Sequence, residues 1–445
     1  MQYARWAEEK EIKERLCSIK PNEEIKRTGV PLMYENDTLY MDNGRTPTLL
    51  IGSTGSGKTQ STILPMLNLS IKAKESFLVV DPKGEMYERI GKKVQEEGYK
   101  TVILNFENTS LGNNWNPLLL PYQIYKEGNK DRAQEMVEEV AYYLFSEEMN
   151  KEQDPFWLNS TIDYFTGLVL YLFTTKTEKE ISLTNVALLS QKLNMDEERQ
   201  NFLKELRQYP TIYFYLTTTL EAPNETRGSI VAVFNQKIKP FISKENLSNL
   251  LSATDIDFKD IVNNKSAVFL IASLTEISKR LIPLYINQVI ESKEVYQNKE
   301  PYNMLLDEFG CMIKMQNFAA TLTNARGLNI QIIAVVQNYK QLESVYGKED
   351  SEILKLCFSN ILYLLSNDIY SLEEISKMCG EVSKDVPLIT IEELKTMKHF
   401  EAIVIMPRLH PFKTKLQPNY KFDWGYQEEA IEIPKRKIVE QTYID

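Results

Sequence analysis

Eight consecutive residues of this 445-residue chain have the types and spacing needed to bind the phosphates of a nucleotide. Residues 52–59 match the pattern G-x-x-x-x-G-K-[ST] in full, follow a short apolar run and precede a predicted helix. The glycines let backbone N–H groups curl around phosphates without side-chain clashes, and the helix N-terminus adds partial positive charge. We predict that Lys58 contacts the β- and γ-phosphates and that the Thr59 hydroxyl ligates Mg²⁺. The predicted phosphate-binding residues are Gly52, Ser53, Thr54, Gly55, Ser56, Gly57, Lys58 and Thr59.

Two acids, Asp307 and Glu308, end a second apolar run that begins at Tyr302. Paired acids after a strand are common on protein surfaces, but here they follow a complete P-loop in the same chain. We predict that Asp307 holds Mg²⁺ through water and that Glu308 is the general base that polarises the attacking water.

Two further polar residues, Arg326 and Gln337, flank the apolar run at residues 330–336. The carboxyl ends of parallel strands face the ligand crevice, so Gln337 could sense the γ-phosphate. Arg326 comes before the same run, at the opposite edge, and could instead reach the nucleotide of a neighbouring subunit as an arginine finger. The alternative is that Arg326 pairs with a surface acid and Gln337 only ends a strand.

The composition excludes several classes of protein. The 52 Lys and Arg against 62 Asp and Glu give a net charge of −10, which argues against a general nucleic-acid-coating surface but not against a few DNA-gripping loops. The four cysteines lack metal-site spacing, so we expect neither a zinc site nor a disulfide framework. His399 and His410 are too few and too isolated for acid–base chemistry.

The P-loop and the acids must be positioned by a sheet. Apolar runs without helical period alternate with amphipathic segments, which is typical of an α/β fold with a mainly parallel central sheet. The predicted strands are residues 48–51, 76–80, 101–104, 267–272, 302–306, 330–336, 361–365 and 402–406.

This alternation stops between about residues 121 and 222, where only amphipathic helical segments occur. We interpret that stretch as an all-α domain inserted into the sheet domain. The predicted division is a lead-in over 1–46, a nucleotide-binding domain over 47–120 and 223–415, the all-α insertion over 121–222 and a tail over 416–445.

Several motifs together resemble one family, the TraG/TraD-like coupling proteins of conjugation and type IV secretion, within the FtsK–HerA superfamily. The resemblance runs from about residue 47 to 407. Beyond the P-loop it is carried by Asp81-Pro82-Lys83-Gly84-Glu85, Trp115-Asn116-Pro117-Leu118, Leu306-Asp307-Glu308-Phe309-Gly310, Asn324-Ala325-Arg326-Gly327, Val336-Gln337-Asn338 and Ser366-Asn367-Asp368.

The resemblance implies a RecA-like P-loop NTPase that uses ATP and Mg²⁺, an all-α domain and a homo-hexameric ring. It implies recruitment of a relaxase–DNA substrate and ATP-driven transfer of single-stranded DNA through a type IV secretion channel. By position, the nucleotide-site residues of the family match Lys58, Thr59, Asp307, Glu308, Arg326 and Gln337.

Most members of the family begin with membrane-spanning helices, and this sequence has no apolar stretch of the required length. We therefore expect a cytoplasmic protein, peripheral at the inner face of the cell membrane. Either it docks on a separate membrane anchor protein as partner, or the anchor is missing from this chain. Two alternatives stay open. One is another FtsK/HerA-type DNA motor or helicase, and the other is an ATP-binding substrate receptor that does not itself pump.

Overall fold

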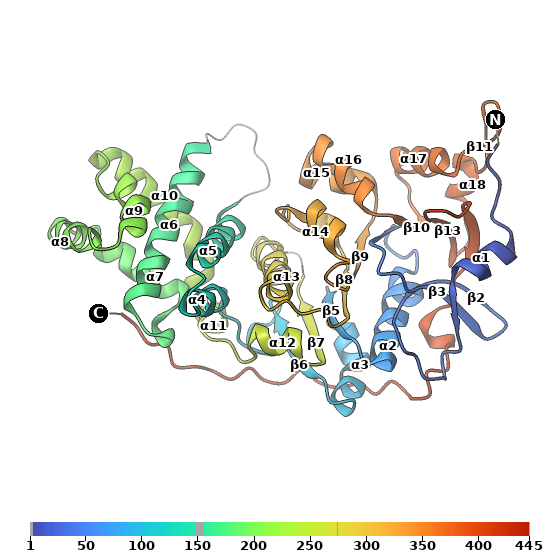
Figure 1. Cartoon of the computed structure of the whole chain (residues 1–445), viewed down its shortest axis with the longest axis horizontal. Coiled ribbons are helices and arrows are strands. Elements are labelled where there is room, and N and C mark those ends of the chain that lie inside the picture. The colour runs from blue at the N-terminus through green and yellow to red at the C-terminus, as the bar shows by residue number, and fades with distance from the viewer. Residues whose placement is uncertain (1–2, 147–154, 274, 445) are drawn as a thin grey trace. The chain divides into compact units, whose positions relative to one another are not determined.

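The computed structural model describes residues 3–146, 155–273 and 275–444, and the chain forms two compact units (Figure 1). The sheet unit comprises residues 1–102, 261–272 and 292–432. The helical unit comprises residues 103–260, 273–291 and 433–445. No helix within the described ranges is both long enough and apolar enough to cross a membrane.

A nine-stranded sheet forms the core of the fold, in the order β14-β13-β10-β4-β9-β8-β5-β7-β6. The five neighbouring pairs from β10 to β7 are parallel, whereas β13 and β14 add to β10 as an antiparallel edge. Every side chain of β4, β5, β7, β8 and β9 is buried, which is why these strands read as continuous apolar runs. The strand bounds are β4 Thr48–Gly52, β5 Ser76–Asp81, β6 Lys100–Asn105, β7 Ser266–Ile271, β8 Tyr302–Leu306, β9 Ile330–Val336, β10 Asn360–Leu365, β13 Glu401–Ile405 and β14 Phe412–Lys415.

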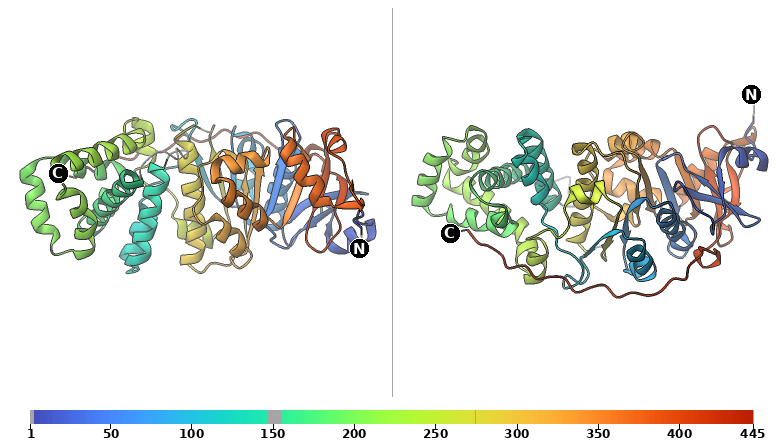
Figure 2. Two further views of the ribbon diagram at one scale, coloured as in Figure 1. Left: turned by 90° about the horizontal axis from the view of Figure 1, so that it is seen from above. Right: turned by 60° about the horizontal axis from the view of Figure 1, so that its bottom comes forward.

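Helices cover both faces of this sheet (Figures 1 and 2). From β4 to β5 the chain moves across the sheet toward the β6 edge. From β8 to β9 and then to β10 it moves toward the opposite edge, at β14. Because parallel crossovers are right-handed, these opposite directions place α2 and α3 on one face and α14 to α16 on the other. The bounds are η1 Thr59–Ile63, α2 Leu64–Ala73, α3 Glu85–Glu96, α13 Ser278–Val295, α14 Phe318–Asn324, α15 Tyr339–Tyr346, α16 Lys348–Cys357, α17 Ile369–Cys379 and α18 Ile391–Lys395.

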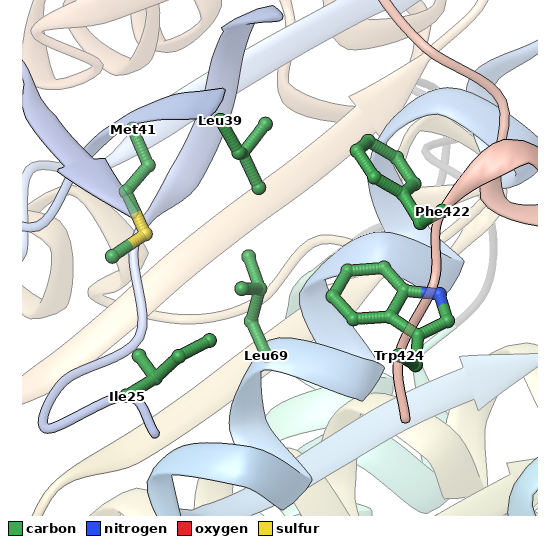
Figure 3. Packing of buried hydrophobic residues seen from close by; sticks show 6 residues of the cluster. All are labelled: Ile25, Leu39, Met41, Leu69, Phe422 and Trp424. Carbon is green, nitrogen blue, oxygen red and sulfur yellow. The ribbon is translucent and has the colours of Figure 1, made fainter. Parts of the chain in front are cut away.

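The first 46 residues are more than a polar lead-in. They contain α1 (Glu9–Arg15) and a three-stranded antiparallel sheet of β1 (Cys17–Ile19), β2 (Val30–Glu35) and β3 (Thr38–Asp42). This small sheet packs on the P-loop helix α2 together with the first part of the predicted tail. The shared cluster is Ile25, Leu39, Met41, Leu69, Phe422 and Trp424, drawn in Figure 3.

The helical unit extends beyond the predicted insertion at 121–222. Helix α10 begins directly after Pro223, and its Phe234 contacts the rings of Phe145 and Tyr164 inside the predicted range. Helix α10 thus continues the helical unit past residue 222, where the sequence analysis placed the end of the insertion. The bounds are α4 Leu119–Lys126, α5 Lys130–Phe145, α6 Pro155–Thr175, η2 Glu178–Glu180, α7 Leu183–Lys192, α8 Asp196–Leu206, α9 Pro210–Leu220, α10 Asn224–Ile242, α11 Glu245–Leu250 and α12 Phe258–Asn263, the last of which crosses into the sheet unit.

The predicted tail, 416–445, also divides between the units. Residues 416–432 belong to the sheet unit, and residues 433–445 belong to the helical unit. The described residues also form a hairpin of β11 (Glu381–Ser383) with β12 (Val386–Pro387) and the 3₁₀ turns η3 (Phe309–Cys311) and η4 (Asn419–Lys421).

Candidate nucleotide-binding site

The P-loop connects the buried strand β4 to a helix that begins with a π-helical turn, η1. Gly55 and Gly57 have φ angles of +80° and +95°, which L side chains rarely adopt, so both positions need glycine. The Lys58 ammonium donates to the carbonyl oxygens of Gly52 at 2.7 Å and Ser53 at 3.2 Å. The lysine is thus held within the loop, next to the place where phosphates bind in this motif.

Three neighbouring strands, β4, β9 and β8, end at the same level. Ile51 of β4 pairs with Val336 of β9, and Leu306 of β8 pairs with Ala334 of β9. The residues that follow these strand ends are the P-loop, Gln337, and the pair Asp307 and Glu308. Because the strands are parallel, all of these groups lie at one carboxyl edge of the sheet.

Asp307 is a buried carboxylate, 6% exposed. Its Oδ1 accepts a hydrogen bond from the Glu308 N–H, and within the described residues it forms no ion pair. Burial raises the pKa of Asp307 to about 6, the neighbouring Glu308 adds to this rise, and Lys58 lowers it. A divalent cation would compensate this buried charge, so the oxygen set of Asp307 and Thr59 fits Mg²⁺.

Glu308 has a φ of +58°, a left-handed conformation that is uncommon for glutamate. Its Oε2 accepts hydrogen bonds from Gln337 Nε2 at 3.3 Å and from the Cys311 thiol at 3.7 Å. The Gln337 backbone N–H donates to Gln341 Oε1. The Nε2 of the same Gln341 amide donates to the Cys311 sulfur. Glu308, Cys311, Gln337 and Gln341 therefore form one hydrogen-bonded group around the predicted base. They come from the turn after β8, the residue after β9, and α15.

Asp81, which ends β5 in the Asp-Pro-Lys-Gly-Glu motif, has a structural partner. Its Oδ2 accepts from the backbone N–H groups of Met86 at 2.9 Å and Tyr87 at 3.1 Å, at the start of α3. Burial raises the pKa of Asp81 to about 6 even though these N–H groups favour the charged form. The motif thus joins β5 to α3 at the same sheet edge as Asp307.

His399 and Phe400 lie against the P-loop, which the sequence did not indicate. A Cβ atom added to Gly57 would stand 2.7 Å from Phe400 Cε1 and 3.3 Å from His399 Cε1. The turn between α18 and β13 presents both rings, and Phe400 has a left-handed φ of +67°. Residues with strained backbones of this kind cluster at functional sites. Nothing in the sequence indicates that a Phe has a left-handed φ, so no pattern could have identified Phe400 as part of the site.

Arg326 lies away from this edge, in the turn between α14 and β9. It is exposed, and across the described part of the chain it forms no ion pair or side-chain hydrogen bond. Leu356 and Ile353 of α16, which are 85% and 53% exposed, line the same surface hollow of about 480 Å³ as Arg326.

The chain is similar in sequence to proteins of conjugation and type IV secretion. A model of the family described as Type IV secretory system Conjugative DNA transfer matches residues 5–386. The chain is 21% identical over 399 residues to the type 4 coupling protein DotL of Legionella pneumophila, covering 75% of this chain and 49% of DotL. It is 21% identical over 372 residues to the conjugal transfer protein TraG of Rhizobium radiobacter, covering 80% of this chain and 55% of TraG. The chain thus spans about half the length of these curated relatives.

Solved structures confirm the predicted fold class. The bacterial conjugative coupling protein TrwB in complex with ADP and Mg²⁺ has a TM-score of 0.71 at 16% identity, covering 98% of this chain and 97% of that one. VirB4 of Thermoanaerobacter pseudethanolicus has a TM-score of 0.55 at 12% identity, covering 88% of this chain and 97% of that one. The RecA-like P-loop fold predicted from the sequence is therefore correct.

Proposed function

Because the chain belongs to the family of type IV secretory system conjugative DNA transfer proteins, we propose that it is a coupling ATPase. In this proposal it recruits a relaxase–DNA substrate and uses ATP hydrolysis to drive single-stranded DNA through a type IV secretion channel. One observation carries the proposal, namely that the P-loop, the acid pair Asp307 and Glu308, and Gln337 meet at one sheet edge. TrwB, which shares the fold, has been solved with ADP and Mg²⁺ and with the ATP analogue ADPNP.

The binding step starts from Lys58. Its two hydrogen bonds to the carbonyl oxygens of Gly52 and Ser53 hold the ammonium within the loop. On ATP binding the ammonium exchanges these neutral acceptors for phosphate oxygens, which are stronger partners because they are charged. Thr59 and Asp307 would hold Mg²⁺, which neutralises phosphate charge.

Glu308 is the general base of the hydrolysis step in this proposal. Its carboxylate takes a proton from the water whose oxygen attacks the γ-phosphorus. ADP leaves as the bond between the γ-phosphorus and the bridging oxygen of the β-phosphate breaks. Gln337 Nε2, 3.3 Å from Glu308 Oε2, fixes the direction of the carboxylate. Since Gln337 also follows the strand beside the P-loop strand, it can report whether a γ-phosphate is present.

Arg326 acts in trans in this proposal. The whole of β9, seven residues long, lies between Arg326 and Gln337. At about 3.3 Å per residue the strand spans roughly 20 Å, too far for an arginine side chain to reach its own nucleotide. Its guanidinium is exposed beside the apolar side chains of Ile353 and Leu356. Exposed apolar groups next to an unpaired cation suit a contact with a second copy of this chain, and repetition of that contact gives a homo-hexameric ring.

The proposed partners are single-stranded DNA, the relaxase, the channel proteins and a separate membrane anchor protein, which would hold the chain at the inner face of the cell membrane. The family membership supports the first three. The anchor protein stays a prediction of the sequence analysis.

The decisive experiment is an ATPase assay with and without single-stranded DNA. We expect DNA to stimulate the wild type, and Lys58→Ala to lose hydrolysis because no other group brings this charge to the phosphates. Lys204→Ala, an exposed lysine on α8, is the matched control and should retain wild-type rates. Hydrolysis without any response to DNA would favour the non-pumping receptor, and normal turnover of Lys58→Ala would refute the site.

A further inference from the structure

Residues 433–444 form an extended segment along the helical unit (Figure 2). They contain no helix, and their one strand-like pairing is the bridge between Lys435 and Leu111. Around this bridge the Gly112 N–H donates to the Pro434 carbonyl at 2.8 Å, and the Arg436 N–H donates to the Ser110 carbonyl at 2.9 Å. The segment therefore lies beside the loop after β6 as a short added strand.

Arg436 is the one buried side chain between residues 427 and 444, at 6% exposure. Its guanidinium donates to neutral oxygens only: Nε to the Thr109 carbonyl at 2.7 Å, Nη1 to Asn114 Oδ1 at 2.7 Å and Asn249 Oδ1 at 2.5 Å, and Nη2 to the Asn246 carbonyl at 3.2 Å. Burial lowers the pKa of Arg436, and the charge of Asp255 opposes this. Four acceptors in a fork match arginine and would not match lysine.

Three asparagines hold the rest of the segment by its backbone. Asn114 Nδ2 donates to the Lys437 carbonyl at 2.8 Å. Asn249 bonds both polar groups of Val439, donating to its carbonyl at 2.7 Å and accepting from its N–H at 3.4 Å. Asn185 in the same way donates to the Thr442 carbonyl at 2.8 Å and accepts from the Ile444 N–H at 3.3 Å.

Residues 433–444 are held by polar contacts, whereas segments of a protein core are held by buried apolar side chains. Two of the segment's large apolar side chains point to solvent, Ile438 at 77% exposure and Tyr443 at 59% exposure. A hydrogen bond contributes about 0.5–1.5 kcal/mol net, and ordering a residue costs about 1–2 kcal/mol. The segment is held mainly by backbone bonds and one arginine, with one long side-chain bond from Gln441 to Ser248, and is therefore close to balance between bound and free.

We propose that Asn114, Asn185, Asn246 and Asn249 line a peptide-binding site for an extended segment that carries an arginine. Residues 433–444 occupy it in cis, and a segment of another protein with the same chemistry exchanges with them. Asn114, Asn185 and Asn249 bond peptide groups of the segment, and the side-chain oxygens of Asn114 and Asn249 also accept from the guanidinium. The site therefore selects an extended backbone and one arginine.

The test uses a fluorescein-labelled peptide of residues 431–444 and fluorescence anisotropy. The full-length chain with Arg436→Ala frees the site, and it should bind the peptide. The wild type should bind it about tenfold or more weakly, because its own segment competes at a high effective concentration. Lys437→Ala, the adjacent exposed side chain, is the matched control and should behave like the wild type.

Two outcomes overturn the proposal. One is equal binding of the wild-type and Arg436→Ala chains, and the other is equal binding of a peptide in which the arginine is replaced by alanine. If Arg436→Ala melts below the assay temperature, a full-length chain with a protease recognition sequence inserted after Glu432 replaces it. After cleavage the labelled peptide should displace the native segment, and retention of that segment against excess peptide would also overturn the proposal.

Discussion

Glu308 is held before any substrate arrives. The Gln337 amide and the Cys311 thiol both donate to its Oε2, and its backbone is in a left-handed conformation. A carboxylate fixed in this way loses little freedom on meeting water, which is the condition for efficient proton transfer. Single-residue changes at this site should therefore separate binding from hydrolysis.

Glu308→Gln should bind ATP with Mg²⁺ normally and hydrolyse it about 10²–10⁴-fold more slowly, because the amide cannot accept the proton. Single-turnover hydrolysis and equilibrium binding of a fluorescent ATP analogue measure the two steps. Glu349→Gln, an exposed glutamate in α16, serves as control. Loss of binding in Glu308→Gln would show that Glu308 is a metal ligand or a structural residue.

Phe400→Ala should weaken ATP binding about tenfold, a loss of about 1.4 kcal/mol, because the ring that packs against Gly57 fixes the position of the P-loop. Isothermal titration with ADPNP checks this. Tyr420→Ala, an aromatic side chain that is 68% exposed, should have no effect. Unchanged affinity in Phe400→Ala would mean that the ring only covers the loop.

At the scale of elements, the strands that position the site were predictable because both of their faces are buried. All eight predicted strands occur, with ends within one residue or so of the sequence estimate. The strands of the first 46 residues were missed because one side of each is polar or mixed and the runs are short. The order of strands, which places β9 between β4 and β8, depends on long-range pairing that no local pattern encodes.

Helix α10 provides the element-scale prediction. Phe234 contacts Phe145 and Tyr164 at centroid distances of 6.1 and 5.3 Å and is fully buried. Phe234→Ala should destabilise the helical unit by about 3–5 kcal/mol through the cavity it leaves. Hydrogen exchange should rise in α5, α6 and α10, while ADPNP binding stays normal.

Phe214→Ala on α9 is the control, because that ring is 74% exposed. No change in exchange for Phe234→Ala would mean that α10 does not share the core of α5 and α6. It would also favour a domain boundary at residue 222, as the sequence analysis had it.

For the whole molecule, the charge of −10 restricts how DNA can be held. A uniformly acidic surface repels phosphates, so the proposed DNA transfer would require a few basic loops, which the proposed ring would gather around its opening. Assembly would therefore be needed twice, once to complete the nucleotide site with Arg326 and once to gather the DNA-contacting loops.

ATPase activity per subunit should consequently rise steeply with protein concentration. Leu356→Asp should shift this rise to higher concentration, because it replaces an exposed apolar side chain beside Arg326 with a charged one. Arg326→Ala should bind ATP but lose about 10³–10⁵ in rate at every concentration. Sedimentation velocity and turnover, measured on the same samples, test both.

Asn324→Ala, an exposed neighbour of Arg326, is the matched control. Two results would exclude a finger acting between subunits. One is wild-type turnover that does not depend on concentration where the protein is monomeric, and the other is normal turnover of an Arg326→Ala monomer.

The single buried side chain of residues 427–444 has a consequence for how this stretch can change over evolutionary time. Substitutions at the exposed positions leave the bonds of Asn114, Asn185 and Asn249 intact, because those bonds reach only peptide groups. Proline is the exception at Val439 and Ile444, where the backbone N–H donates. Related chains should therefore differ freely along this stretch, while one arginine persists at a constant number of residues after the aromatic pair Phe422 and Trp424.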